Sequence, residues 1–365
     1  MSTPEDVLRN FVRETHATHV DGRLLERFER VTGHKPHRYL RRGIIFCHRD
    51  LEGILDKFEG GEPFYLFTGR GPSSDSLHVG HAIPFEFTKW LQDVLNARLI
   101  IMLTDDMKLL HSKSLSIEAV RRYDIDNAKD ILAFGFNPHK TFLFSNLDYV
   151  GGAFYENIIG VARHISVSNI KIALGFGDED NVGMFYCCST QSAGIFATSF
   201  PGILGTDQEQ LRLMCCLIAC SYDIDGYFTE VRKHTEKLCY SKPAFLYSSL
   251  LPALQDAHAK MSASVISSAI FLTDSPSMVR DKLETAFPDG ATDTEALFQY
   301  LRFFVKDDQE LEKLECGFQS EKLTVKDLRA ALTKVVQEQI TKFQEDRVQI
   351  TDPYLKDVMT RRLLE

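Results

Sequence analysis

Short apolar runs alternate with stretches of helical spacing through the middle of the chain. The apolar runs cover 62–67, 98–104, 141–144, 213–220 and 244–247. Their length and their flanking turn or charged residues predict buried strands, and the stretches between them, such as 79–96, predict helices. Strands that are apolar on both faces and alternate with helices indicate a parallel sheet covered on both sides. We therefore expect an α/β protein with a Rossmann-like parallel-sheet catalytic domain.

Both ends of the chain lack this alternation. Residues 4–57 are rich in charge and have helical spacing, and beyond Asp274 the pattern is helix-like and contains no strand signal. The later helix-like stretches are 277–287, 294–304, 323–346 and 353–364. The pattern predicts an N-terminal helical appendage over 1–60, a catalytic domain over 61–274 and a C-terminal helical domain over 275–365.

The charge balance is acidic. The sequence has 42 Lys and Arg against 51 Asp and Glu, which gives a formal net charge of −9. Net charge therefore excludes a general affinity for polyanions, and nucleic acid would need a local basic patch. No stretch approaches the roughly 18 apolar residues of a membrane span, and the N-terminus lacks the apolar core of a signal peptide. We expect a soluble, cytoplasmic protein without membrane partners.

Cysteine usage indicates the compartment. Most of the eight cysteines lie in apolar runs such as 213–220, which is typical of core residues in a reducing compartment. No Cys-x-x-Cys pair occurs. The sequence therefore predicts no metal site formed by the protein itself.

The loop after the first predicted strand has the composition of a nucleotide-binding turn. It contains Gly69 and Gly71 and leads into His78-Val79-Gly80-His81 at a helix start, with no Gly-x-Gly-x-x-Gly fingerprint. Two histidines three residues apart lie on one helix face and can donate to phosphate oxygens, while Gly80 lets a flat base approach the backbone. Two ordinary surface histidines are the alternative interpretation.

A second candidate motif follows the last strand signal. Lys260-Met261-Ser262-Ala263-Ser264 offers one cation and two hydroxyls to a polyphosphate. An ordinary exposed loop is the alternative interpretation of this stretch alone.

Together, the two motifs on a Rossmann-like core resemble the signatures of class I aminoacyl-tRNA synthetases. Further stretches of the sequence restrict this resemblance to one family within the class, because they look like the eukaryotic and archaeal type of tryptophanyl-tRNA synthetase. These stretches are 40–44, 64–74, 88–93, 104–106 and 303–308. The resemblance covers the chain from about Leu24. It implies ATP-dependent activation of tryptophan as an acyl adenylate, transfer to tRNA(Trp), a homodimer and an anticodon-binding-like C-terminal domain.

The resemblance also implies roles for the motif residues. His78 and His81 would contact the ATP phosphates, and Lys260 would stabilise the leaving pyrophosphate, which makes these three the expected catalytic residues. Magnesium would arrive bound through the phosphates. The ATP-binding residues implied are Gly69, Arg70, Gly80, Met261, Ser262 and Ser264.

The amino-acid pocket departs from the pattern of that family. Phe67 and Met102 occupy the positions where the family has Tyr and Gln, which hydrogen-bond the indole nitrogen. Met107 and Ile224 replace a Glu and a Gln that contact the substrate's ammonium group, whereas Gln191 is retained. The substrate-binding residues implied are Phe67, Met102, Thr104, Met107, Gln191 and Ile224.

Two hypotheses follow from these departures. In the first, the protein is a tryptophan–tRNA ligase in which neighbours such as Tyr222 or Asp223 restore the lost contacts. In the second, it adenylates another hydrophobic carboxylic acid, amino-blocked or amino-free, and transfers it to a small amine or amino acid without tRNA. A buried ammonium group without its carboxylate costs several kcal/mol, which favours the second hypothesis if nothing compensates.

The resemblance predicts dimerisation through the helical region that follows the second strand. Tyr123, Ile125, Ile131 and Leu132 are the apolar residues expected to supply area there.

Overall fold

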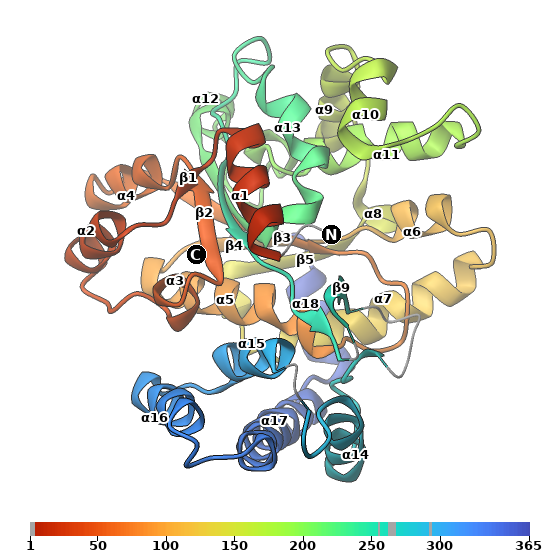
Figure 1. Ribbon diagram of the computed structural model, residues 1–365. Helices are drawn as coiled ribbons and strands as arrows, with labels where there is room; N and C mark the ends of the chain where they lie inside the picture. Colours follow the sequence, from red (N-terminus) through yellow and green to blue (C-terminus); the bar gives the residue numbers. More distant parts are fainter. Residues whose placement is uncertain (1–3, 255, 262–267, 292–293) are drawn as a thin grey trace.

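The computed structural model describes residues 4–254, 256–261, 268–291 and 294–365. Its centre is a sheet of seven strands in the order β1-β2-β7-β6-β3-β4-β5 (Figure 1). The strands are β1 Thr18–His19, β2 Ile45–Arg49, β3 Phe64–Arg70, β4 Arg98–Leu103, β5 Thr141–Ser145, β6 Cys215–Ser221 and β7 Ala244–Ser248. Strands β3 to β7 are parallel, and β1 and β2 are antiparallel at one edge. The Rossmann-like α/β class is therefore confirmed.

The strand order reverses at β3. The chain proceeds from β3 to β4 and β5 on one side and later returns to β6 and β7 on the other. In such sheets a crevice opens at the carboxyl ends of the two strands that flank the reversal, because their connections leave in opposite directions. The carboxyl ends of β3 and β6 therefore define where a ligand is expected.

The sheet is covered by helices on both faces. The helices of the described residues are α1 Pro4–Thr15, α2 Gly22–Thr32, α3 Arg38–Arg41, α4 Leu51–Glu59, α5 Val79–Leu95, α6 Asp105–His111, α7 Ile117–Leu132, α8 Asn146–Tyr149, α9 Gly152–Ala162, α10 Val167–Leu174, α11 Val182–Ala193, α12 Gln208–Leu213, α13 Gly226–Arg232, α14 Pro276–Ala286, α15 Glu295–Phe304, α16 Asp308–Gln319, α17 Val325–Val348 and α18 Asp352–Met359. Of these, α14 to α17 pack chiefly against one another, below the sheet layer in Figure 1. Short 3-10 helices lie at Pro138–Lys140, Ala197–Ser199 and Tyr222–Ile224, and a small hairpin pairs β8 Pro252–Ala253 with β9 Asp256–Lys260. Within the described ranges, no helix is both long and apolar enough to cross a bilayer.

Alternate residues of each central strand enter different cores. Leu66 and Leu99 belong to the core shared with α4, α5, α7 and the C-terminal helices, whereas Phe67 and Ile100 face the core shared with α9 and α13. Side chains on a strand point to opposite faces, so a strand between two helical layers must be apolar at every position. This explains the continuous apolar runs from which the strands were predicted.

Two expectations need correction. Residues 4–57 are not purely helical, because the fully buried β2 pairs with β7 and extends the main sheet. The second concerns the expected dimer face: Ile131 and Leu132 are 0% and 1% exposed and belong to the protein's own core. Ile125 is 51% exposed, so α7 keeps only part of the predicted apolar surface.

Ion pairs fasten the C-terminal helices to the sheet layer. Arg42 pairs with Asp308 at 2.7 Å, and Arg347 Nε lies 2.7 Å from Asp130. Arg41, the last residue of α3, also pairs with Asp308, the first residue of α16. These contacts hold the C-terminal helices against the helices that flank the crevice.

Candidate active site

A cavity of about 760 Å³ opens at the carboxyl ends of β3, β4, β6 and β7. Predicted site residues from distant parts of the sequence line it together. They are Phe67, Gly69, Arg70, His78, Gly80, His81, Met102, Thr104, Met107, Gln191, Ile224 and Met261. Lys260 ends β9, and its side chain, like Ser262 and Ser264, lies outside the described residues. The cavity is at the strand-order reversal, where the topology places it.

The two histidines form one stacked unit at the start of α5. Their ring centroids are 3.5 Å apart, and His81 Nε2 lies 2.9 Å from Arg70 Nη1. His78 is 4% exposed, and burial, assisted by the charge of Arg70, lowers its pKa to about 3. His78 is therefore neutral at physiological pH. It can contact a phosphate by hydrogen bonding but cannot bring a positive charge to it.

The second motif and the segment that follows it lie against the first motif. Phe271 forms an antiparallel bridge with His78, and the Val79 backbone N–H donates to the Ile270 carbonyl at 2.9 Å. Within the motif itself, Met261 Sδ would be 3.7 Å from a Cβ placed on Gly80. Residues separated by about 180 positions in the sequence are therefore neighbours at one end of the cavity.

Gly80 has little room for a side chain. A Cβ there would lie 3.1 Å from two atoms of the His78 ring. The backbone at Gly80 is thus open to the cavity only because the residue is glycine. This arrangement fits the prediction that a flat base approaches this position.

Two cationic residues lie near the histidines. The guanidinium of Arg70 is buried, and burial lowers its pKa to about 10, so it remains charged at neutral pH. Its Nη2 has no hydrogen-bond partner among the described residues. Lys108 also lines the cavity, and a Cβ on Gly71 would overlap its Cε at 2.3 Å. Sequence reasoning missed Lys108 because a single lysine on α6 gives no signal of its own.

The opposite part of the cavity has an apolar floor. Met102 Sδ and Phe67 Cζ would be 3.0 and 3.2 Å from a Cβ on Gly194, at the end of α11. Gln191 Nε2 donates to Met107 Sδ at 2.8 Å, a weak acceptor. The apolar replacements inferred from the sequence therefore face the cavity rather than the protein core alone.

Asp223 and Tyr227 bring polar groups to this same part. Both residues line the cavity, and in the sequence one precedes and the other follows Ile224. Ser221 Oγ donates to Asp223 Oδ1 at 2.6 Å. Burial raises the pKa of Tyr227, with a contribution from the charge of Asp223, so its hydroxyl stays protonated. Tyr222 instead packs against Phe11, with ring centroids 5.6 Å apart. Of the two residues suggested as compensating groups, only Asp223 is a lining residue of the described cavity.

The described residues contain no cluster of three or more His, Cys, Asp or Glu that could hold a metal ion.

Comparisons with known proteins identify the family. The family model described as tRNA synthetases class I (W and Y) matches residues 59–179 and 193–348. The chain belongs to this family. It is 44% identical to the cytoplasmic tryptophan–tRNA ligase of Schizosaccharomyces pombe, over 91% of this chain and 86% of that protein. It is 42% identical to the human cytoplasmic enzyme, over 94% of this chain and 75% of that protein.

Solved structures of the same family share the whole fold. A tryptophanyl-tRNA synthetase from Giardia lamblia matches with a TM-score of 0.90 at 34% identity, covering 100% of this chain and 99% of that chain. One from Encephalitozoon cuniculi, bound to tryptophan, matches with a TM-score of 0.88 at 33% identity, covering 97% and 100%. The predicted resemblance to class I synthetases of the tryptophan type is confirmed, as is assignment to the aminoacyl-tRNA synthetase ligases.

Proposed function

We propose that this class I synthetase activates tryptophan with ATP and transfers the tryptophanyl group to tRNA. The observation that carries the proposal is one continuous cavity that joins the stacked histidines to an apolar pocket bearing Asp223. It is supported by relatives named as tryptophan–tRNA ligases and by a similar structure that contains tryptophan. The relatives are named as cytoplasmic enzymes, and we propose that this protein is also located in the cytoplasm.

The proposed chemistry is a displacement at phosphorus. A carboxylate oxygen of the substrate attacks the α-phosphorus of ATP, and the bond to the bridging oxygen of pyrophosphate breaks. Negative charge grows on the leaving pyrophosphate, where Arg70, Lys108 and, by its motif, Lys260 would stabilise it. His78, being neutral, would position a phosphate oxygen by one hydrogen bond. Magnesium would enter bound to the phosphates.

The amino acid would occupy the apolar part of the cavity. Phe67 and Met102 would contact the indole ring, and the carboxylate of Asp223 would receive the ammonium group that Met107 cannot bind. Tyr227 and the amide oxygen of Gln191 would supply further acceptors. A buried ammonium group needs such a carboxylate because leaving it unpaired costs several kcal/mol.

A second candidate function rests on one observation. Met107 and Ile224 line the cavity with apolar groups, as a site for a hydrophobic acid without a free ammonium group would require. Such an enzyme would pass its adenylate to a small amine or amino acid and would not use tRNA. Charging of tRNA with radiolabelled tryptophan separates the two: sustained charging supports the first function, and adenylate formation without any charging supports the second.

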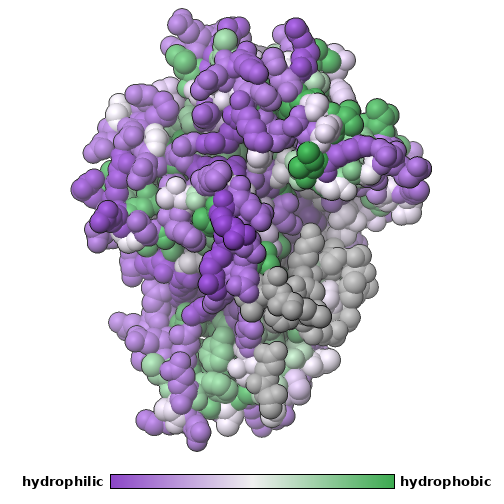
Figure 2. Space-filling view, turned by 45° about the horizontal axis from the view of Figure 1, so that its top comes forward, coloured by the Kyte–Doolittle hydropathy of each residue, from purple (hydrophilic) through white to green (hydrophobic). Residues whose placement is uncertain are grey.

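We propose a homodimer, formed through a surface that differs in part from the predicted one. Exposed apolar residues gather on the adjoining helices α9, α10 and α11, on the right of Figure 2, where Figure 1 places these helices. They are Tyr155, Ile159, Val167, Ile172, Val182 and Tyr186. Exposed apolar side chains that gather on adjoining helices are typical of subunit interfaces.

Light scattering at micromolar concentration should therefore give the mass of two chains. Ile172→Asp, at a position 83% exposed, is expected to shift the protein toward the monomer by placing a charge in the interface. Val348→Asp, at a position 77% exposed on α17, is the matched control and should remain dimeric. A monomeric mass for the unmodified protein would refute the dimer.

A further inference from the structure

A second cavity lies outside the proposed active site. It has a volume of about 320 Å³ and is formed where the end of β2 meets the end of α13 and the segment before β7. Four permanently cationic residues line it, Arg49, Arg232, Lys233 and Lys242, together with two histidines and three threonines. Asp50 is the single carboxylate among the lining residues. A concentration of cations is not expected from a protein of net charge −9.

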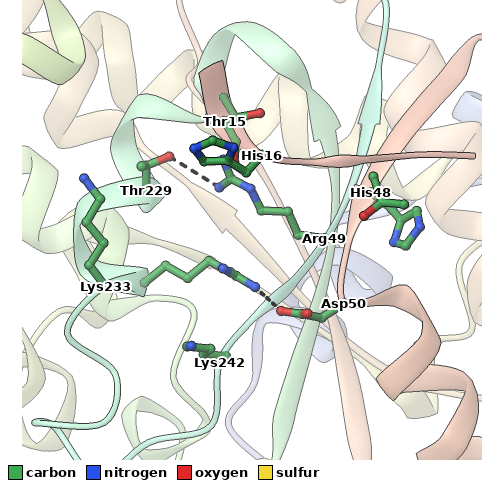
Figure 3. A pocket seen from close by; sticks show the side chains of 10 residues that line it. Thr15, His16, His48, Arg49, Asp50, Thr229, Lys233 and Lys242 are labelled. Carbon is green, nitrogen blue, oxygen red and sulfur yellow. Dashed lines mark hydrogen bonds and ion pairs between the residues drawn. The ribbon is translucent and has the colours of Figure 1, made fainter. Parts of the chain in front are cut away.

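The two arginines are held in fixed positions. Arg49 binds Asp225 through both terminal nitrogens, at 3.0 and 3.3 Å, and both side chains are at least nine-tenths buried. Arg49 also lies 3.5 Å from Thr229 Oγ1 (Figure 3). Arg232 donates to the Pro243 carbonyl at 3.2 Å and pairs with Asp50. Arg49 also donates to the Thr15 carbonyl at 3.1 Å, so its terminal nitrogens are engaged within the protein and it serves as a fixed wall of the cavity. Arg232, held through its Nε, can orient a bound anion without losing side-chain entropy.

The two lysines are more exposed and adjustable. Lys233 and Lys242 are 59% and 52% exposed and lie across the view from His48 in Figure 3. Lys233 pairs with Glu230 at 2.5 Å, and Lys242 is 3.9 Å from Glu236. Because Glu236 is 89% exposed, Lys242 can turn toward an anion in the cavity at small cost. Glu230 is only 12% exposed, but Lys233 itself is 59% exposed and lines the cavity.

Helix α13 connects this cavity to the proposed active site. Tyr227 and Phe228 line the larger cavity, whereas Thr229 and Arg232 line the smaller one. The β2–β7 register places Arg49 opposite Phe245, near the start of β7, while Ser248 at its end lines the larger cavity. The two cavities therefore lie at opposite ends of α13 and β7.

We propose that this smaller cavity binds a phosphate group. The guanidinium of Arg232 and the ammonium groups of Lys233 and Lys242 approach the cavity from several directions, which suits a tetrahedral anion with oxygens on every side. The volume equals about ten water molecules, so the phosphate can be attached to a larger group. The same chemistry would recognise a phosphodiester of an RNA strand or a small phosphorylated compound.

The test compares two double variants. Lys233→Ala/Lys242→Ala removes the adjustable cations, and Lys313→Ala/Lys326→Ala removes two exposed lysines from the C-terminal helices as a charge-matched control. Binding of inorganic phosphate is measured by calorimetry with a non-hydrolysable ATP analogue present, and binding of bulk tRNA is measured over a range of salt concentrations. We expect about a tenfold loss of affinity for the first variant only, with recovery in Lys233→Arg/Lys242→Arg.

The two arms distinguish the sources of the phosphate. If the first variant binds inorganic phosphate more weakly but binds tRNA normally, the ligand of the smaller cavity is a small phosphorylated compound. A salt slope for tRNA that falls by about two in the first variant assigns an RNA phosphodiester backbone. Equal behaviour of the first variant and the control in both arms would overturn the proposal. Tryptophan-dependent pyrophosphate exchange should be the same in all variants, so failure of the proposed function is recognised separately.

Discussion

Adenylate formation is expected to slow by about 10²–10³-fold when His81 or Lys260 is replaced by alanine. Both residues are proposed to contact phosphate oxygens whose charge grows as pyrophosphate leaves. An interaction that strengthens in the transition state lowers kcat when removed and changes the KM for the carboxylic acid little. Single-turnover adenylate formation measured over a range of acid concentrations separates the two quantities.

Exposed residues of the same types provide controls for this prediction. His34→Ala and Lys313→Ala change residues on the surface, away from the lining of the cavity, and should leave both constants unchanged. If both phosphate-site variants turn over at the rate of the unmodified protein, the assignment of the two motifs is wrong. The neutral state of His78 adds a pH test: its pKa of about 3 predicts no change in rate from this group between pH 5 and 9.

Asp223→Asn is expected to lower kcat/KM for tryptophan by about 30- to 10³-fold. Asp223 is exposed in the structure, so the estimate assumes that the bound amino acid covers the carboxylate; removing one partner of a charge pair covered in this way costs roughly 2–4 kcal/mol. Asparagine keeps the size of the side chain and its contact with Ser221, so the change isolates the charge. The measurement is tryptophan-dependent ATP–pyrophosphate exchange.

The same variant should behave differently toward an acid that lacks the ammonium group. Exchange driven by indole-3-propionate is expected to be no lower in Asp223→Asn than in the unmodified protein, because no charge pair is lost. Asp281→Asn, at an exposed position on α14, is the control. A tryptophan kcat/KM that is the same in both aspartate variants would remove Asp223 from the substrate site and leave the ammonium group without a partner.

The sequence predicts the central fold because its signals are local. Each parallel strand is buried on both faces and is therefore a continuous apolar run, as at 98–104. Strand β2 is not predicted from the sequence, because its burial depends on pairing with β7, about 200 residues away. Helix α16 is also not predicted, because most of its residues are polar and Leu311 is its buried residue.

The candidate site divides in a similar way. His78, Gly80 and His81 are adjacent in sequence, so their spacing alone indicates a nucleotide site. Asp223 could be suggested only together with Tyr222, from its place beside Ile224, and the structure shows which of the two lines the cavity. Lys108 carries no local signal, and it joins the cavity only because β4 and β6 end at the same edge of the sheet.

ATP–pyrophosphate exchange with the unmodified protein tests the central claim most directly. Tryptophan and indole-3-propionate are compared at equal concentration, because they differ only in the ammonium group that Asp223 is proposed to bind. The account predicts exchange with tryptophan at about 10²-fold or more above exchange with the analogue, followed by charging of tRNA when tRNA is added. Exchange with the analogue that equals or exceeds exchange with tryptophan, without charging of tRNA, would contradict it.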